Sequence, residues 1–394
     1  MTSSLRVSLG YELEVRGRTR EVEQQAFQNV IDQVVLGDRL GCEAAWFVEH
    51  HFTRGFSHCS APDLILAAIS QRTERIRLGL GVVLLPFQSP IRTAERVATL
   101  DVLSGGRVEF GTGRGASPLE YQAFQRPFEK SRQIWEDSLE ATLAIWQADG
   151  EPVSRSNEFF EIPDVAVYPR PAQRPHPPVW VASTSLDGYL AAARHGYNLL
   201  GMTMLKGIDD VAADIAKYRE CLAEHGFDPA ERRVALMIPW YVAPTRDEAT
   251  AIAADPVLWY IRRQVNLVTP PDYYDARHAT HRVLGQLAAG LPPEESMATL
   301  REHLMVVVDD VEGSRKALAR IAEAGATDLI IQAQVGGLAH EQVCDSMTLF
   351  MTEVAFKTEV ASRSEGASRT EGAFMDEVAG GADQSPRPAR EVTR

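Results

Sequence analysis

The feature that most constrains the fold of this chain is an alternation of short β-rich runs with longer amphipathic stretches, repeated almost to residue 356. Strands that alternate with helices are typical of parallel sheets. The chain is therefore predicted to be an α/β protein. Eight runs are predicted as strands, over residues 6–13, 44–50, 76–84, 107–113, 179–184, 198–204, 234–243 and 327–334.

The stretches between these strands carry helix signals. Residues 21–40 place apolar side chains at helical spacing, as expected of a helix that covers a sheet. Pro62, Pro90 and Pro118 stand near the expected starts of helices, where a missing N–H costs little. An open doubly wound sheet uses the same alternation, but eight strands favour closure into a TIM (β/α)8 barrel. The chemistry of such a barrel lies at the carboxyl ends of its strands.

Two segments interrupt the alternation, and we expect them to be insertions at the carboxyl face of the barrel. Residues 151–178 are rich in proline, and residues 245–300 contain Trp259, Tyr260 and further aromatic side chains. A long insertion over a catalytic face usually forms a lid or a substrate wall. The composition of residues 357–394 is typical of a disordered tail. The barrel domain is therefore predicted to span residues 1–356.

The composition limits the partners of the chain. Its 40 Lys and Arg residues against 54 Asp and Glu residues give a formal net charge of -14, which repels nucleic acid and anionic membranes. No apolar run is long enough to span a bilayer, and the first residues are too polar for a secretory signal. Four scattered cysteines without CxxC spacing argue against a disulfide framework. We expect a cytoplasmic protein that binds a small molecule.

The densest set of reactive side chains is EHHFT at 49–53, followed by His58 and Cys59. One imidazole at a barrel mouth suffices for acid/base chemistry, and only one of His50 and His51 can face the mouth because neighbouring strand residues point to opposite faces. A metal site would need three or four converging ligands, and HxH and HxxxH spacings are absent. Histidines that only form hydrogen bonds in a packed loop are the third interpretation.

A second group of residues has the chemistry of an anion site. Residues 110–118 carry closely spaced glycines and Arg114, whose guanidinium suits a phosphate. The spacing is GxGxG, with no acidic ribose partner about twenty residues on, so this is not a dinucleotide fingerprint. Arg132 and the hydroxyl run 183–185 lie near helix starts, and together these residues predict an anion cradle. A tight turn, a solvated arginine and helix capping remain as alternatives.

Glycines also interrupt the third predicted strand, at Gly79 and Gly81. Glycine weakens a strand, so it usually marks a bulge or a close approach by a flat ligand. A concession to side-chain packing explains these positions equally well.

Several motifs in compatible order make the chain, over roughly residues 5–356, resemble the bacterial luciferase-like flavin-dependent monooxygenases. Members of this family are TIM barrels, usually dimeric, that bind reduced FMN or the deazaflavin F420 at the carboxyl face. The motifs are EHHFT at 49–53, LLP at 84–86, LDVLSGGRVEFGTGRG at 100–115, Ser131-Arg132, VYP at 167–169, the hydroxyl turn at 183–185 and GGLAHEQV at 336–343.

The resemblance implies a role for each site residue. Gly81 and Val82 would lie where the family often has a cis peptide behind the isoalloxazine ring, and His50 would be the acid/base group beside the reactive C4a position. The EHHF motif favours FMN over F420. The phosphate would be held by Arg114, Arg132 and Ser185, with Thr184 beside them.

The resemblance also implies the reaction. Reduced FMN and O2 would form a C4a-(hydro)peroxide that gives one oxygen atom to a small organic substrate. No NAD(P)H fingerprint is present, so a separate flavin reductase would supply the reduced flavin, and the chain would be a homodimer. Luminescent relatives commonly carry a cysteine where Gly113 stands and a glutamate where Thr184 stands, so the sequence does not predict light emission.

Three other functions remain open at this point. An F420-dependent oxidoreductase would use the same barrel, with His50 assisting hydride transfer. A metal-dependent hydrolase would be built on His50, His51 and His58. A flavin-binding protein without turnover is the third.

Overall fold

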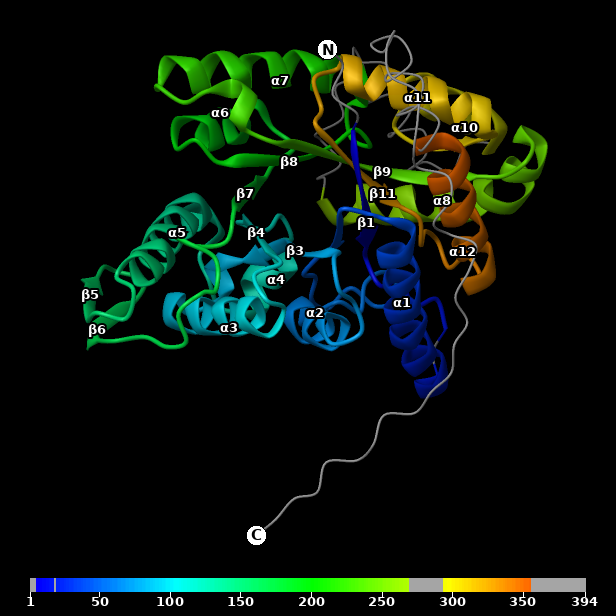
Figure 1. Ribbon diagram of the computed structural model, residues 1–394. Coiled ribbons are helices and arrows are strands. Elements are labelled where there is room, and N and C mark those ends of the chain that lie inside the picture. The colour runs from blue at the N-terminus through cyan, green and yellow to red at the C-terminus, as the bar shows by residue number, and fades with distance from the viewer. Residues whose placement is uncertain (1–4, 18, 269–292, 356–394) are drawn as a thin grey trace, which may run out of the picture.

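The computed structural model describes residues 5–17, 19–268 and 293–355, in which eight parallel strands close into a barrel (Figure 1). The β8–β9 and β11–β1 pairings complete the ring. In ring order the strands are β1 (Arg6–Tyr11), β2 (Ala44–Phe47), β3 (Arg77–Leu84), β4 (Val108–Gly113), β7 (Val179–Ala182), β8 (Asn198–Met202), β9 (Val234–Val242) and β11 (Asp328–Gln332). Each lies inside a range predicted from the sequence, and the predicted TIM barrel is confirmed.

Helices surround the barrel on its outer side (Figure 1). They are α1 (Arg20–Leu40), α2 (Pro62–Ser70), α3 (Pro90–Leu103), α4 (Pro118–Ala123), α5 (Ser131–Gln147), α6 (Leu186–Arg194), α7 (Gly207–Glu224), α8 (Arg246–Val268), α10 (Pro293–Glu302), α11 (Val311–Glu323) and α12 (His340–Leu349). As predicted, Pro62, Pro90 and Pro118 are the first residues of α2, α3 and α4. None of the described helices is both long enough and apolar enough to cross a membrane.

The interior of the barrel is filled by large apolar side chains. Trp46 from β2 and Trp180 from β7 meet edge to face, with ring centroids 5.3 Å apart. Glycines on the strands beside them make the room: a Cβ on Gly79 would lie 2.2 Å from the Trp46 ring, and one on Gly111 would lie 2.0 Å from the Leu80 carbonyl oxygen. Close packing against a side chain or a neighbouring backbone therefore explains Gly79 and Gly111.

A network of charged side chains closes the amino-terminal end of the barrel. Arg233 contacts three carboxylates, with Nη2 bound to Asp328 and 3.3 Å from Glu43, and Nη1 3.4 Å from Glu109. Arg6 and Arg77 pair with Asp328 and Glu109 from the other side. These buried charges are paired, as burial requires.

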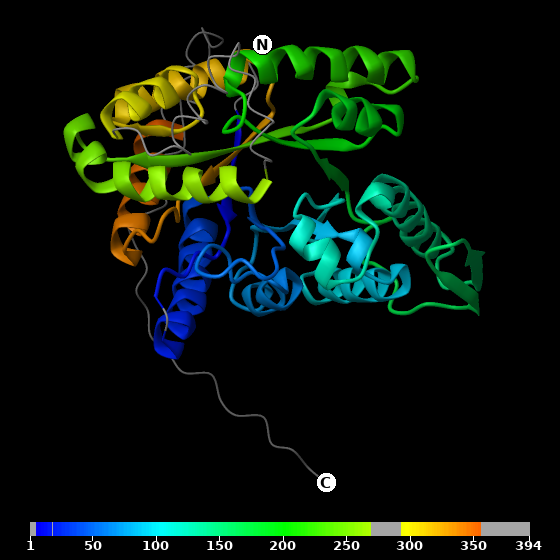
Figure 2. The same cartoon turned by 180° about the vertical axis from the view of Figure 1, so that it is seen from behind.

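The two segments predicted as insertions begin at opposite ends of the barrel. Residues 245–300 follow β9, so α8 starts at the carboxyl face as expected. Residues 151–178 form the antiparallel hairpin β5 (Val153–Ser156) and β6 (Glu161–Val165), which stands at the edge of the molecule beyond α5 (Figure 2). The Gln173 amide then donates to the carbonyl of Val108, the first residue of β4, at 2.8 Å. The expectation that this segment lies at the carboxyl face is therefore wrong, because it connects a helix to the start of the next strand.

A short strand, β10 (Val307–Asp309), was not predicted, and it pairs in parallel with the carboxyl half of β9. Tyr273, Tyr274 and the predicted tail 357–394 lie outside the described residues.

Candidate active site

Four neighbouring strands, β2, β3, β4 and β7, bring the predicted site residues to one arc of the barrel rim. Because parallel strands end at the same edge of a sheet, residues that follow them are neighbours. β1 precedes β2 in the ring and leads to two further acidic residues, Glu12 and Glu14. Gly81 and Val82 lie within β3, while the residues that follow the other strand ends are His50, Arg114, Thr184 and Ser185.

The imidazole of His50 lies between two buried carboxylates. Its Nε2 is 3.5 Å from Oε2 of Glu12, and its Nδ1 is 3.7 Å from Oε1 of Glu120. The His50 side chain is 24% exposed, whereas those of Glu12 and Glu120 are 2% and 1% exposed. The imidazole is therefore the accessible member of this group, with the carboxylates behind it.

These contacts shift the ionisation of the cluster. Burial by itself lowers the pKa of His50, but the nearby carboxylates of Glu12, Glu120 and Glu49 outweigh it, so the pKa is raised. Burial raises the pKa of Glu12, against the opposing charge of His50 and a hydrogen bond from Tyr260. The cluster therefore favours a proton on the imidazole, and burial makes Glu12 harder to ionise than an exposed glutamate.

Helix α8 reaches this cluster from the other side of the rim. The Tyr260 hydroxyl and the Gln264 amide each donate to Oε1 of Glu12, both at 3.2 Å. Tyr260 and Gln264 are themselves buried. The described part of the 245–300 segment therefore holds Glu12 in place, and its role as a lid or substrate wall stays a prediction.

His51 engages a different carboxylate, as expected for the neighbour of His50. Its Nε2 is 3.1 Å from Oε1 of Glu49, which also accepts from Gln88. The backbone N–H of His51 donates to Glu120 at 2.9 Å, and its ring packs edge to face against Phe124 with centroids 4.9 Å apart. Glu120 therefore fixes the backbone of the double-histidine segment as well as facing the His50 ring.

The peptide bond between Gly81 and Val82 is cis, as the resemblance predicts. A Cβ on Gly81 would lie 3.3 Å from the Trp46 ring, and Val82 is buried in the same interior cluster as Trp46. The register of β3 against β4 shifts between Leu80 and Val83. This segment therefore combines a bulge with a close approach of backbone to the barrel interior.

Arg114 is tied to the start of α5. Its Nη1 donates to the hydroxyl of Ser131, the first residue of that helix, at 3.0 Å, and the Tyr121 hydroxyl donates to its backbone carbonyl. Arg132, the next residue of α5, is exposed and forms no ion pair with the residues that the structure describes. Two guanidinium-bearing residues therefore stand at one helix N-terminus, whose partial positive charge also favours anions.

The hydroxyl turn follows β7, the neighbour of β4. Ser185 is the N-cap of α6, and its Oγ accepts from the N–H of Gly188 at 3.3 Å. The Ser183 hydroxyl accepts from the N–H of Ser185, while Thr184 between them is exposed. Capping accounts for the two serines, and Thr184 remains accessible at the rim.

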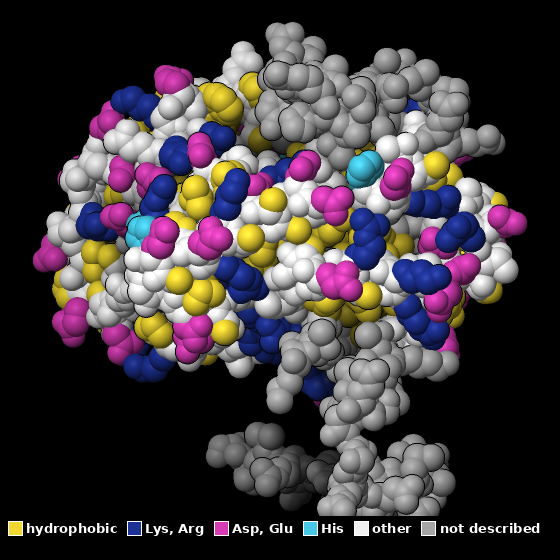
Figure 3. Space-filling view, turned by 90° about the horizontal axis from the view of Figure 1, so that it is seen from above, with side chains coloured by type: hydrophobic (Ala, Val, Ile, Leu, Met, Phe, Trp, Pro, Cys, Tyr) yellow, Lys and Arg dark blue, Asp and Glu magenta, His cyan; other side chains and the backbone are white. Residues whose placement is uncertain are grey.

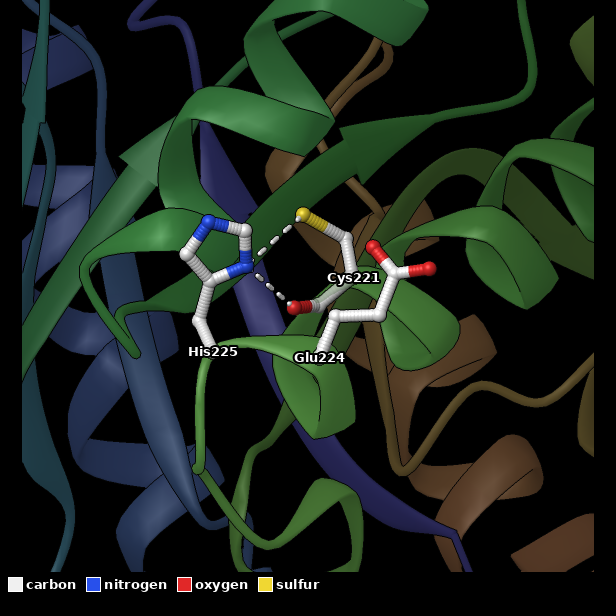
Figure 4. Close-up of side chains that lie close together, drawn as sticks. All are labelled: Cys221, Glu224 and His225. Carbon is white, nitrogen blue, oxygen red and sulfur yellow. Dashed lines mark hydrogen bonds between the residues drawn. The ribbon is translucent and has the colours of Figure 1, made fainter.

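The histidines do not converge on a metal position. His58 pairs with Glu23, at 3.4 Å, rather than with the carboxylates of His50 or His51. The group of described residues whose ligand atoms do converge is Cys221, Glu224 and His225, at the end of α7 (Figure 4). There Nδ1 of His225 is 2.9 Å from the Cys221 carbonyl oxygen, so this imidazole serves as a cap of the helix terminus.

Sequence reasoning missed the residues that hold the histidines. Glu12 and Glu120 are both almost fully buried, and Tyr260 and Gln264 join them from α8. A signal existed at Glu12 and Glu14, which interrupt the apolar end of the first predicted strand. A buried charge at such a position needs partners. Nothing in the spacing of Glu120 indicates its contact with residues about 70 positions earlier.

The sequence profile of the luciferase-like monooxygenase family matches residues 7–328. The chain belongs to this family. Its relatives named as monooxygenases show that it is an oxidoreductase that incorporates oxygen. Among relatives of this luciferase-like type, the oxygenase component of a flavin-dependent trigonelline monooxygenase from Acinetobacter baylyi is 28% identical, with 75% of this chain and 78% of that protein covered. The 4-hydroxyprotoasukamycin monooxygenase of Streptomyces nodosus subsp. asukaensis is 34% identical, with 64% and 68% covered.

Solved structures show the same fold. Monooxygenase RslO1 from Streptomyces bottropensis superposes with a TM-score of 0.78 at 24% identity, covering 90% of this chain and 100% of that one. The oxygenating constituent of 3,6-diketocamphane monooxygenase from Pseudomonas putida, in complex with FMN, gives a TM-score of 0.73 at 21% identity, covering 90% and 99%.

Proposed function

We propose that this chain is the oxygenase component of a two-component system, which uses reduced FMN and O2 to oxygenate a small organic substrate. The observation that carries the proposal is the placement of Arg114 and Thr184 at adjacent strand ends, with Arg132 at the start of α5 and His50 farther along the same arc. The relative from A. baylyi, named as an oxygenase component, supports a separate flavin reductase as the partner.

The donor set at the rim fits the phosphate of FMN. Arg132 and Thr184 are exposed, and Arg114 is anchored by a single hydrogen bond from its guanidinium to Ser131. Guanidinium groups and helix N-termini are the donors that phosphate prefers in proteins. Arg114, Arg132, Thr184 and Ser185 would therefore hold the phosphate, and the Gly81–Val82 backbone would line the place of the ring.

The flavin supplies the oxygen chemistry when it is bound. The chain would orient the flavin through its phosphate. The two ring nitrogens of His50 would hold or transfer protons. The α8 side chains Tyr260 and Gln264 exclude water behind Glu12. A site closed in this way protects reactive oxygen species from solvent.

The chain is proposed to form a homodimer. Exposed apolar side chains on helices α2 and α3 (Leu64, Val102 and Leu103) support this oligomeric state.

Location, partner and domain bounds complete the proposal. Four free cysteines support a cytoplasmic location. Acidic and basic side chains are interspersed over the described part of the face in Figure 3, which supports a small-molecule partner rather than nucleic acid. We assign residues 1–356 to the barrel domain and 357–394 to the tail.

The second candidate is an F420-dependent oxidoreductase. An F420-dependent secondary alcohol dehydrogenase gives a TM-score of 0.69 at 17% identity. Titration of the purified protein with each cofactor separates the two, because FMN and F420 absorb at different wavelengths. Tighter binding of F420 than of FMN would overturn the assignment.

The phosphate site is tested by charge removal. Arg114→Ala and Arg132→Ala should each weaken the binding of reduced FMN by roughly 10- to 150-fold, since one charge-assisted contact contributes about 1.5–3 kcal/mol. Anaerobic titration followed by flavin fluorescence measures the affinity. Arg155→Ala is the matched control, because Arg155 lies in the β5–β6 hairpin and its ion pair among the described residues is with Glu140 of α5. Wild-type affinity in both site variants would defeat the proposal.

A further inference from the structure

Both ring nitrogens of His50 face a carboxylate. Nε2 faces Glu12 from the end of β1, and Nδ1 faces Glu120 from α4, on opposite edges of the ring. A neutral imidazole has one N–H and one lone pair, so it would turn its lone pair toward one of these carboxylates. Only an imidazolium presents an N–H to both.

The charges around His50 favour the same state. Among the described residues, the titratable groups that face it are Glu12, with Tyr260 of α8 behind it, Glu120, and Glu49 in its own segment. Cys59 contributes only its backbone carbonyl, which accepts from the N–H of His50. Three carboxylates thus lie around one imidazole, and a protonated ring would offset part of their negative charge.

We propose that Glu12 and Glu120 are positioning residues that hold His50 as an imidazolium at the barrel mouth, with one N–H directed at each carboxylate. The inference deepens the proposed function and rests on it in assigning His50 to the reaction. The raised pKa of His50 agrees with the geometry, since the carboxylates outweigh the effect of burial. The competing arrangement is a proton on Glu12, whose pKa burial raises, beside a neutral His50.

The protonation state decides what His50 can do. An imidazolium can give up a proton, whereas a neutral imidazole can take one up. A fixed imidazolium therefore makes His50 a general acid rather than a general base. Glu12 would set this state from the interior of the protein without touching the ligand.

The test is an NMR titration of the flavin-free protein, which requires no substrate. The ring Cε1–H resonance of His50 is assigned by its loss in His50→Gln, and its titration midpoint is measured. We expect the wild-type midpoint to lie above that of a histidine in a denatured chain. Glu12→Gln and Glu120→Gln should each lower the midpoint by about one pH unit or more. Glu12→Asp, which keeps the charge, should recover at least part of the shift.

Glu23→Gln is the matched control. It removes a carboxylate 3.4 Å from a different imidazole, His58, and should leave the His50 midpoint unchanged. A wild-type midpoint at or below that of the denatured chain overturns the proposal, and so does an unchanged midpoint in both Glu12→Gln and Glu120→Gln. Thermal unfolding of each variant shows whether it is folded; if a glutamine variant is not folded, the wild-type midpoint compared with that of the denatured chain decides the proposal.

The same variants separate this inference from the proposed function. In reductase-coupled oxygen uptake, Glu12→Gln should move the alkaline limb of the kcat profile to lower pH, and Glu12→Asp should move it back. If no flavin-dependent oxygen uptake is found, the proposed function fails while the NMR midpoints still decide the state of His50. If uptake is found with unshifted midpoints, only the inference fails.

Discussion

At the scale of the residue, His50 is the side chain on which turnover should depend most. His50→Ala is expected to lower reductase-coupled turnover by about 100-fold, because it removes the proton-transfer group, while the phosphate donors still bind the flavin. Oxygen uptake and flavin titration measure the two effects separately. His58→Ala, which removes an imidazole paired only with Glu23, should keep wild-type turnover. Equal turnover in both variants would remove the role of His50.

Residue identity predicted part of this site. His50 and Arg114 were found because imidazole and guanidinium groups carry chemistry wherever they follow a strand. Glu12 and Glu120 were not, since their function comes from burial beside His50, and burial is set by the packing of β1 and α4 against a distant segment. The role of the strand glycines was ambiguous for the same reason. Gly79 lies against the Trp46 ring, and this contact depends on the register between β2 and β3.

At the scale of the element, β3 accepts the interior tryptophan only because it carries glycine. Gly79→Ala places a Cβ 2.2 Å from the Trp46 ring and should lower the free energy of unfolding by about 1–3 kcal/mol. Urea unfolding monitored by circular dichroism measures the loss. The Trp46→Phe replacement makes the ring smaller. It should lower the free energy of unfolding by less in the Gly79→Ala background than in the wild type. Strictly additive losses would show that the two side chains do not compete for the same space.

The element boundaries followed from the sequence where the pattern repeats. Strand and helix alternate with proline at three helix starts, and both signals are local. The sequence predicts only a proline-rich insertion where the hairpin β5–β6 lies. Its pairing depends on two strands together, and neither segment alone carries a strand signal. Strand β10 has three residues, too few for a periodic signal, and exists because it pairs with the end of β9.

At the scale of the whole molecule, buried carboxylates lie at both ends of the barrel, with different consequences. At the amino-terminal end, Arg233 and its neighbours pair with the buried carboxylates of Glu109 and Asp328. At the carboxyl end, Glu12 and Glu120 face a single imidazole at distances beyond an ordinary hydrogen bond. The fully paired network around Arg233 suits a structural role. The looser contacts around His50 leave polar groups available to a ligand.

The closed end predicts a large stability effect from one side chain. Arg233→Met should lower the free energy of unfolding by about 3 kcal/mol, because Glu109 and Asp328 would stay buried with fewer partners. Arg233→Lys should lose less, since it keeps the charge but not the planar fork. Arg155→Ala, which breaks a surface pair with Glu140, should change stability by about 0.5 kcal/mol or less. Equilibrium urea unfolding ranks the three variants, and a loss in Arg233→Met no larger than that in Arg155→Ala would show that the barrel does not depend on this network.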